Sequence, residues 1–390
     1  MAKGRGGFIG QDGLNAPDSP TGVTGTPDDQ SVSVAFTAPT DVGGSAITGY
    51  RAQSNTGVGA SGSSSPITVT GLSNGTAYTF NVWAINAFGY SAPSDASGSV
   101  TPAQPTLAMI FQGGGNTAIA KFNMDSAGNA TDFGDSPINI NIPCALSNAT
   151  RLIQAGGDSD SNEIHYWTVS SGGTGQDFGD SATNGYGRGA VNTNTRGVFM
   201  GGYISGVINT MDYVTIASTG NGTDFGDLTV GKYRGAGSVN STTRGIHSAG
   251  YIQGFSNTNV IDYITIASTG NATDFGDTSG SKRQLAGCSN STRGILAGGI
   301  ESSATNEIDY ITIASQGNAS DFGDLSNNAQ ELGAAANSTN AFFYSGNFAS
   351  GNGIQYVTIA STGNSTTWAD LYSSQQNAQY GTSAGHGGLS

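Results

Sequence analysis

The chain has 390 residues, of which 62 are glycine and only 10% are charged, whereas about a quarter of the residues are charged in an average soluble chain. This composition excludes a helix-rich protein, because Gly, Ser, Thr and Asn supply turns while Tyr, Phe, Val and Ile supply strands. The formal net charge of −14 would repel phosphate groups, so we expect no nucleic-acid partner. No apolar run approaches the roughly 18 residues that span a bilayer, and we therefore expect no membrane insertion.

The first segment, residues 1–15, reads MAKGRGGFIGQDGLN and contains five glycines without hydrophobic periodicity. Such a segment cannot fold alone. One interpretation is a disordered tail. The other is an anchoring arm in which Phe8 and Ile9 dock into a partner, because glycine lets the backbone follow another protein's groove. The segment lacks the apolar core of a secretory signal, so we expect the mature protein to start near Met1.

The next segment, from Pro17 to about Pro105, alternates short strand-like runs with turn signals at intervals of about ten residues, which is typical of a β-sandwich. Its clearest alternating strand is Ser31–Phe36. The phrases at Gly43–Gln53 and Ser65–Ser94 resemble a fibronectin type III domain. The resemblance implies a β-sandwich over residues 16–104, which we interpret as a spacer rather than a binding module, because this fold is commonly strung between other domains.

The fibronectin resemblance also assigns roles to individual residues. Leu72 is expected to plug the sandwich, and Tyr78 to form the tyrosine corner. Tyr78, Phe80, Val82 and Ala84 are expected to point inward in alternation. Phe36 stands where the family usually has tryptophan, which preserves an aromatic core residue.

After residue 105 the chain repeats itself. The phrase Asp-Phe-Gly-Asp recurs at intervals of 45 to 50 residues, within the range of propeller blades. Each repeat also has a strand ending in glycine, such as Arg196–Gly202, then a strand such as Asp212–Ala217, and a small-residue strand such as Gly237–Ser241. Four short strands per repeat are typical of a propeller blade. Copies of the phrase begin at Asp132, Asp177, Asp224, Asp274 and Asp321, and a degraded copy spans Thr367–Asp370.

These repeats resemble kelch-type propellers, which have a Gly-Gly pair at the end of one strand and an aromatic residue on the next. The resemblance implies that residues 105–390 form a six-bladed kelch-like β-propeller, so that the fold class is all-β throughout. We expect Gly381–Gly385 to close the ring by pairing with Ala108–Gly114. The aromatic residues of the repeated phrase are expected to pack between adjacent blades, namely Phe133, Phe178, Phe225, Phe275, Phe322 and Trp368.

Catalytic and metal sites are not predicted. Galactose oxidase-like enzymes also join a propeller to a sandwich, and they use tyrosines, histidines and a cysteine around copper. Here His165, His247 and His386 fall at different points of the repeat, and Cys144 and Cys288 show no partnering pattern. We therefore expect no copper site, no other cofactor and no disulfide framework, and we interpret the cysteines as buried apolar residues.

The acidic and amide residues of the repeats are interpreted as structural, because they recur with the repeat and do not form the separated carboxylate pair of a glycosidase. We therefore expect no enzymatic activity. The acidic loop with Asp158, Asp160 and Glu163 is either a calcium site or, as we favour, a solvated loop. The acids that end the phrase are expected to accept strand-end hydrogen bonds: Asp135, Asp180, Asp227, Asp277 and Asp324. Formal glycosylation triplets are expected to form turns instead, at Asn129, Asn221, Asn271, Asn318 and Asn364.

The opening segment, the fibronectin-like module and the Ser-Thr-Gly-Asn/Asp-Phe-Gly-Asp repeats together resemble structural proteins of marine tailed bacteriophages, such as cyanophages. That resemblance implies a virion protein at the particle surface, either a capsid decoration or a tail or neck appendage, bound to other virion proteins through the arm. Loops of variable length at 202–211, 254–260 and 300–307 are expected to recognise host surface glycans. A bacterial surface adhesin is the second interpretation, and a propeller enzyme acting on carbohydrate is the third.

Overall fold

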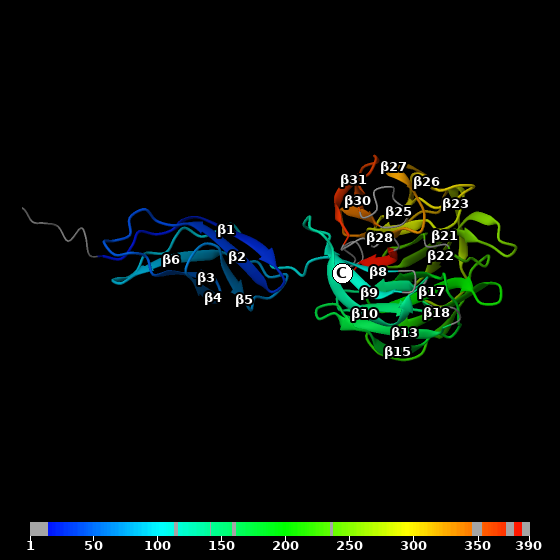
Figure 1. Ribbon diagram of the computed structural model, residues 1–390, viewed down its shortest axis with the longest axis horizontal. Helices are drawn as coiled ribbons and strands as arrows, with labels where there is room; N and C mark the ends of the chain where they lie inside the picture. Colours follow the sequence, from blue (N-terminus) through cyan, green and yellow to red (C-terminus); the bar gives the residue numbers. More distant parts are fainter. Residues whose placement is uncertain are drawn as a thin grey trace, which may run out of the picture. The chain divides into compact units, whose positions relative to one another are not determined.

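The computed structural model of the protein describes residues 15–112, 116–140, 142–157, 161–234, 237–344, 353–371 and 378–383. All regular elements in these ranges are β-strands, and none of the described residues belongs to a helix long and apolar enough to cross a membrane. The chain divides into two compact units, Met1–Pro105 and Thr106–Ser390, which are blue and cyan-to-red in Figure 1.

The N-terminal unit consists of two antiparallel sheets. Strand β6 shows why they form: its residues FNVWAIN alternate between buried and half-buried, because successive side chains of a strand point to opposite faces. The first sheet orders β1 (Thr21–Asp28), β2 (Ser31–Thr37) and β5 (Ile67–Thr70), and the second orders β4 (Gly59–Gly62), β3 (Gly49–Ser54), β6 (Phe80–Asn86) and β7 (Gly89–Tyr90).

The core of this unit contains the residues that the sequence predicted. Leu72, Tyr78, Phe80, Val82 and Ala84 are all buried in one cluster, which confirms the inward alternation. The Tyr78 hydroxyl accepts a hydrogen bond from the Ser73 N–H at 3.0 Å, as expected for a tyrosine corner.

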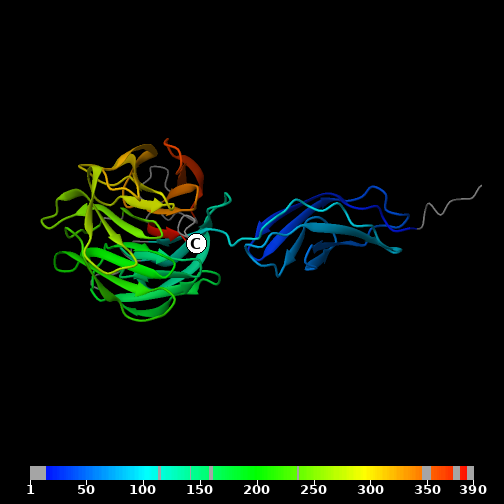
Figure 2. The ribbon, with the colours of Figure 1, turned by 180° about the vertical axis from the view of Figure 1, so that it is seen from behind.

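The described residues of the C-terminal unit form six sheets, numbered here in chain order, of which sheets 3 to 6 each consist of four consecutive strands. Their ribbon is shown from two sides in Figures 1 and 2. Sheet 1 orders β32 (Ala378–Ser383), β8 (Leu107–Gln112), β9 (Asn116–Asn123), β10 (Thr131–Ile140) and the short β14 (Gly173–Thr174). Sheet 2 orders β11 (Cys144–Ser147), β12 (Arg151–Ala155), β13 (Glu163–Thr168) and β15 (Gln176–Asp180).

The remaining four sheets repeat the same order of four antiparallel strands. Sheet 3 contains β16 (Gly189–Asn192), β17 (Arg196–Tyr203), β18 (Val207–Thr215) and β19 (Thr223–Asp227), and sheet 4 contains β20 (Gly237–Asn240), β21 (Arg244–Tyr251), β22 (Asn257–Thr265) and β23 (Thr273–Lys282). Sheet 5 contains β24 (Ala286–Ser289), β25 (Arg293–Ala297), β26 (Thr305–Thr312) and β27 (Ser320–Ala329), and sheet 6 contains β28 (Gly333–Ala336), β29 (Asn340–Tyr344), β30 (Gly353–Thr358) and β31 (Thr366–Asp370).

The first strands of successive sheets are neighbours. Strand β11 lies beside β16, β16 beside β20, β20 beside β24, β24 beside β28, β28 beside β32, and β32 beside β11. The strand nearest the chain end, β32, pairs antiparallel with β8, so that Gly381 faces Ile110, and Figure 1 shows the red β32 arrow beside β8. This pairing was predicted for Gly381–Gly385, of which the last two residues lie outside the described ranges.

The repeated Asp-Phe-Gly-Asp phrase joins each sheet to the next. Between sheets 3 and 4, the Gly270 N–H donates to the Phe225 carbonyl at 2.7 Å and the Ala272 N–H to the Asp227 carbonyl at 2.8 Å. The Asp227 N–H donates to Asn271 Oδ1 at 3.1 Å. Gly226 permits this approach, because its φ is +136° and a Cβ there would lie 2.5 Å from the Gly270 carbonyl oxygen. We call this arrangement the inter-sheet latch.

The latch corrects two expectations about polar residues. It recurs after sheets 2, 4 and 5, and a shorter form joins Asp370 of sheet 6 to Asn129 of sheet 1 at 3.2 Å. The asparagines therefore connect neighbouring sheets rather than only forming their own turns. Among the phrase-ending acids, only Asp135 accepts a hydrogen bond through its carboxylate, from Thr117 at 3.2 Å, as far as the described residues show. In the other four acids it is the backbone carbonyl that accepts the recurrent bond, from an N–H of the following sheet.

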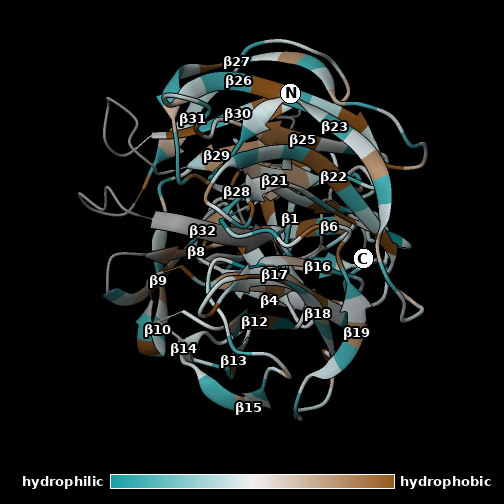
Figure 3. Cartoon of the chain, turned by 90° about the vertical axis from the view of Figure 1, so that its right-hand side faces the viewer, coloured by the Kyte–Doolittle hydropathy of each residue, from teal (hydrophilic) through white to brown (hydrophobic). Residues whose placement is uncertain are grey.

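Hydrophobic clusters fill the spaces between successive sheets. Phe225 lies in a cluster with Ile264 and Ile266 of the next sheet, and Phe133, Phe178, Phe275 and Phe322 occupy corresponding clusters. Trp368 is half-buried and contacts Phe342 and Tyr356 with ring centroids 5.0 and 5.1 Å apart. Figure 3 shows hydrophobic colouring on the inner strands β21 and β25 and hydrophilic colouring on the outer strand β15.

Candidate functional site

Most residues considered for chemistry in the sequence are placed apart. His165 and His247 are buried in β13 and β21, and the described part of the chain holds no group of three or more His, Cys, Asp or Glu suited to a metal ion. Cys144 and Cys288 are buried and free, and burial raises the pKa of the Cys144 thiol to about 12. Phe8, Ile9, Asp158, Asp160 and His386 lie outside the described residues, and Glu163 begins β13.

Three buried ion pairs among the described residues were not predicted from the sequence. The Lys232 ammonium lies 2.8 Å from the Asp262 carboxylate, with both side chains at most 1% exposed, and it also donates to the Val260 carbonyl at 2.8 Å. Arg188 pairs with Asp212 and Lys282 with Asp309 in the neighbouring sheets. The sequence does contain a signal for these pairs, because an Asp precedes the aromatic residue of the third strand in each of the three repeats. These pairs are enclosed, and we interpret them as structural.

Aromatic side chains gather where the segments entering sheets 3 and 4 meet the hairpins that follow their second strands. Tyr186 forms an isolated bridge with Tyr203, and Tyr233 with Tyr251. The Tyr233 ring lies 5.4 Å from Tyr186, 5.2 Å from Tyr203 and 6.2 Å from Tyr251, measured between centroids. Phe255 lies 5.9 Å from both Tyr203 and Tyr251. These five rings form one continuous cluster.

Charged and amide groups adjoin the rings. Arg234 donates from Nε to the Tyr233 hydroxyl at 2.7 Å, and its guanidinium lies 3.5 Å from the Glu331 carboxylate. Gln284 donates from Nε2 to the same carboxylate at 2.6 Å. The Arg283 guanidinium lies 4.6 Å from the Tyr251 centroid. We call this set the tyrosine–arginine site: Tyr186, Tyr203, Tyr233, Tyr251, Phe255, Arg234, Arg283, Gln284 and Glu331.

Protonation at the site follows from burial. Burial raises the pKa of the Tyr233 hydroxyl, while the Arg234 guanidinium acts in the opposite direction and lowers it. Tyr233 is therefore a neutral phenol at neutral pH. The site thus combines a neutral aromatic surface with positively charged donors, the Arg234 and Arg283 guanidinium groups, and a negatively charged acceptor, the Glu331 carboxylate.

The backbone of the site is strained. Arg234, Phe255, Gln284 and Glu331 have φ between +52° and +60°, a left-handed conformation that costs an L-residue roughly 1–2 kcal/mol. Gly187 has the same conformation, with φ +64°, at no such cost. Only two other non-glycine residues in the described ranges have positive φ, Gln30 and Ala249. Strain of this kind clusters at functional sites.

Three of the four strained residues belong to one inter-sheet arrangement, whereas Phe255 lies in the hairpin of sheet 4, where its N–H donates to the Ile252 carbonyl. The Arg234 N–H donates to the Gly187 carbonyl at 3.0 Å, the Gln284 N–H to the Arg234 carbonyl at 2.8 Å, and the Glu331 N–H to the Gln284 carbonyl at 3.1 Å. Equivalent positions of consecutive repeats are thereby linked. A left-handed backbone favours glycine, yet the three strained positions each carry a larger side chain.

The site is accessible from solvent. Phe255 is 58% exposed, and Tyr186, Tyr203, Tyr251 and Arg283 are half-buried. Tyr203 and Phe255 come from hairpins at two of the three loops that were predicted to carry recognition, 202–211 and 254–260. The third loop, 300–307, begins at Ile300, which bridges Arg283.

Two comparisons with known proteins bear on the fold. Residues 18–99 match the family model of the fibronectin type III domain. The N-terminal unit is a fibronectin type III domain. A solved structure titled "Structure of YjhT" is similar to this chain with a TM-score of 0.57 and 12% identity, covering 67% of this chain and 94% of that one. At this identity the likeness concerns the fold alone.

Proposed function

We propose that the C-terminal unit is a closed six-bladed β-propeller of the kelch type, in which each sheet is one blade. The cyclic order of neighbouring first strands supports this architecture. The pairing of β32 with β8 and the Asp370–Asn129 bond both join the last repeat to the first. Full closure removes exposed sheet edges, and it would hold the tyrosine–arginine site on a rigid scaffold.

We propose that the protein is a non-enzymatic binding protein that recognises surface glycans at the tyrosine–arginine site. The observation that carries the proposal is that, of the six non-glycine residues with positive φ in the described ranges, four belong to this exposed site. Phe255 is both strained and 58% exposed, and neither property favours folding. A sugar ring packs its apolar face on aromatic rings, while its hydroxyls bond to guanidinium and carboxylate groups.

The binding proposal is tested with an immobilised panel of bacterial surface glycans and the full chain. Replacing Phe255 by Ala should weaken binding to the recognised glycan by about tenfold, as removal of an anchoring aromatic does. Stability should change by no more than about 0.5 kcal/mol, because the side chain is exposed. The matched control is Tyr90→Ala in β7, since Tyr90 is 57% exposed in the fibronectin domain. Equal affinities for the wild type and Phe255→Ala would refute the proposal, and glycan cleavage would favour an enzyme.

We also propose that the protein is carried on a bacteriophage particle and attached through residues 1–15. The support is the resemblance of its opening segment and repeats to phage structural proteins. A variant lacking residues 1–15 should show the wild-type melting transition but be absent from purified particles. Its normal incorporation would contradict attachment through the arm, and absence of the intact protein from any particle would favour a bacterial surface adhesin.

A further inference from the structure

Four sheets of the C-terminal unit contain the same internal cation site. An arginine at the start of the second strand stacks on a tyrosine of the third strand and donates to a carbonyl of the following sheet. In sheet 3, the Arg196 guanidinium lies 4.4 Å from the Tyr213 centroid and Nη1 donates to the Ile266 carbonyl at 3.0 Å. The corresponding pairs are Arg151 with Tyr166, Arg244 with Tyr263 and Arg293 with Tyr310, at 4.4 to 4.5 Å.

Sheet 6 keeps the tyrosine but has no arginine at this position. Its strand register pairs Asn340 with Thr358, as sheet 3 pairs Arg196 with Thr215. Asn340 therefore occupies the arginine position, and Tyr356 occupies the tyrosine position. The Asn340 side chain is too short to stack across the ring, and its Oδ1 accepts a 3.4 Å hydrogen bond from Thr358. Among the described residues, no guanidinium lies over the Tyr356 ring.

The acceptors for a guanidinium are present on the neighbouring sheet. Met124 of sheet 1 corresponds to Ile266 of sheet 4, and its carbonyl accepts one bond, from Asn337 Nδ2 at 2.9 Å, which leaves its second lone pair. The next residue is Asp125, whose Oδ1 lies 3.1 Å from the same Nδ2. In sheet 4 that position is Ala267, whose carbonyl accepts from Arg196 at 2.8 Å. A guanidinium stacked on Tyr356 would therefore have the Asp125 carboxylate near the position that the Ala267 carbonyl occupies in the Arg196 site.

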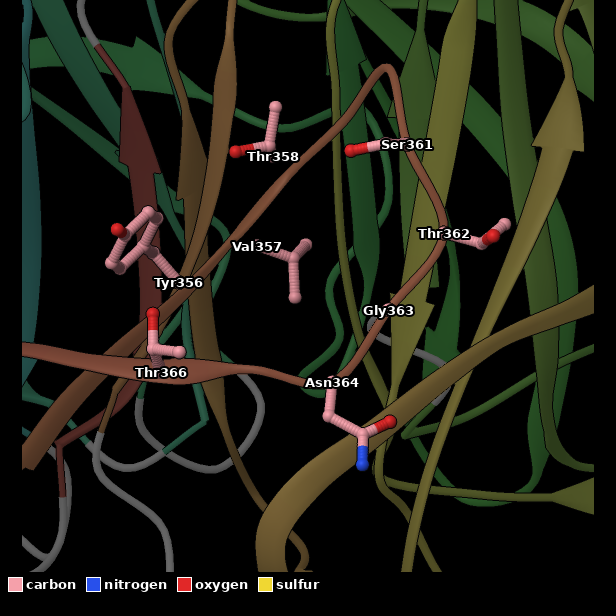
Figure 4. A pocket seen from close by; sticks show the side chains of 8 residues that line it. All are labelled: Tyr356, Val357, Thr358, Ser361, Thr362, Gly363, Asn364 and Thr366. Atoms are coloured by element: carbon pink, nitrogen blue, oxygen red, sulfur yellow. The ribbon is translucent and has the colours of Figure 1, made fainter.

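A pocket of about 250 Å³ opens beside the tyrosine. Figure 4 shows Tyr356, Val357 and Thr358 along one arm of the β30–β31 hairpin, Thr366 on the other arm, and Ser361, Thr362, Gly363 and Asn364 around the turn. The Tyr356 side chain is half-buried, so its ring is partly open to solvent. Apart from Val357 and Gly363, the lining residues are polar and uncharged, which suits a planar cation with several N–H donors.

We propose that the Tyr356 position of sheet 6 binds a guanidinium group supplied by another molecule. The four filled sites of the same chain display the geometry that such a group adopts on this scaffold. Stacking on an aromatic face stabilises a cation, and the formal net charge of −14 favours its approach. The guanidinium belongs either to an arginine side chain of a partner protein or to a small molecule. The proposal concerns a different site from the tyrosine–arginine site and holds independently of glycan binding.

The test titrates the full chain with N-acetyl-arginine amide and with N-acetyl-citrulline amide, which has nearly the same shape without the charge. Binding of the arginine compound, followed by calorimetry, should be at least about tenfold tighter, because the neutral analogue loses the cation–π and charge-assisted contacts. Methylguanidinium and a Gly-Arg-Gly peptide distinguish the source. Equal affinities indicate a small molecule, and tighter peptide binding indicates a protein partner. Equal affinities for the arginine and citrulline compounds would overturn the proposal.

A substitution allows the chain to fill its own site. Asn340→Arg should stack its guanidinium on Tyr356, raise the melting temperature and abolish binding of the arginine compound. Asn340→Gln is the matched control and should bind as the wild type does, because its amide cannot replace the cation. Tyr356→Leu should lose binding while sheet 6 remains folded. This variant tests the site if Asn340→Arg fails to fold. Undiminished binding by Asn340→Arg or by Tyr356→Leu would overturn the proposal.

Discussion

Sheets 3 to 5 and sheet 6 share a repeat but differ at three corresponding positions. Sheets 3 to 5 bury an acid–base pair, whereas sheet 6 has Gln355 at the acid position. The amide oxygen of Gln355 accepts from the Ser326 N–H at 3.0 Å, as the Asp212 carboxylate accepts from the Ala182 N–H at 3.2 Å. A neutral amide therefore replaces the buried acid without a cation, because it satisfies the same backbone donor.

The other two differences lie on the opposite side of the same sheet. Asn340 replaces an arginine, and Trp368 replaces the phenylalanine of the repeated phrase. Residues that recur, such as the latch asparagines, hold neighbouring sheets together. Residues that depart from the repeat, such as Phe255, Glu331 and Asn340, define the two proposed binding sites. In a repeat protein the exceptions are thus better guides to function than the consensus, because the consensus is selected for stacking.

The largest predicted difference between these sheets is the contribution of the phrase aromatics to stability. Phe225→Ala should lower the free energy of unfolding by about 3–5 kcal/mol, as expected for removal of a fully buried ring. Phe225 is 2% exposed and lies between two sheets. Trp368→Ala should cost less, because Trp368 is half-buried and its indole N–H has no hydrogen-bond partner among the described residues.

Chemical denaturation of the two variants measures the difference. The transition should remain cooperative in both, so that the midpoints can be compared at a common slope. A Phe225→Ala variant as stable as the wild type but defective in binding would show that the phrase aromatics contact a ligand. A larger loss of unfolding free energy for Trp368→Ala than for Phe225→Ala would contradict the prediction. It would show that the interface between sheets 6 and 1 contributes more to stability than the interface between sheets 3 and 4.

The sequence predicted the features that depend on local periodicity. Alternation located β6 and the inward residues Phe80, Val82 and Ala84, and the repeated phrase located the outer strand of each sheet. Each of these features is encoded within a few consecutive residues, so that pattern and spacing suffice to find it.

The remaining features depend on contacts between repeats. Tyr186 and Tyr233 meet although 47 residues separate them, and their convergence follows from how successive sheets stack. The strain at Arg234 and Glu331 was invisible, because nothing in the residue type signals a left-handed backbone. Four of the five phrase-ending acids accept the recurrent bond through the backbone carbonyl and not through the carboxylate, and recurrence of an acid in the sequence does not reveal which of the two groups makes the bond. The absence of an arginine in sheet 6 could be recognised only from the strand register, which shows that Asn340 is equivalent to Arg196.

The smallest predicted effect concerns pH and again distinguishes sheet 4 from sheet 6. The pKa of His247 lies well below its ordinary value of 6.5, first because the ring is buried and second because the Lys232 ammonium is near. Burial also lowers the pKa of His165 in sheet 2, although nearby acids oppose that shift. Sheet 6 has Phe343 at the position of His247, as the pairing of Phe343 with Gln355 shows. Among the described residues, the histidines with a lowered pKa therefore belong to sheets 2 and 4.

The sign follows from proton uptake. The native protein keeps His247 neutral, whereas the unfolded chain binds a proton as the pH falls through about 6.5. Stability from this group is therefore fully present above about pH 6.5 and decreases as the pH falls below it. We expect the melting temperature of the wild type to decrease between about pH 7.5 and pH 5.5, and that of His247→Asn to decrease less, because asparagine does not titrate in this window. The His247 Nδ1 lies 3.0 Å from the Ser238 hydroxyl oxygen, a contact that an asparagine amide can replace. Identical pH profiles for the two proteins would show that His247 does not control the acid sensitivity of sheet 4.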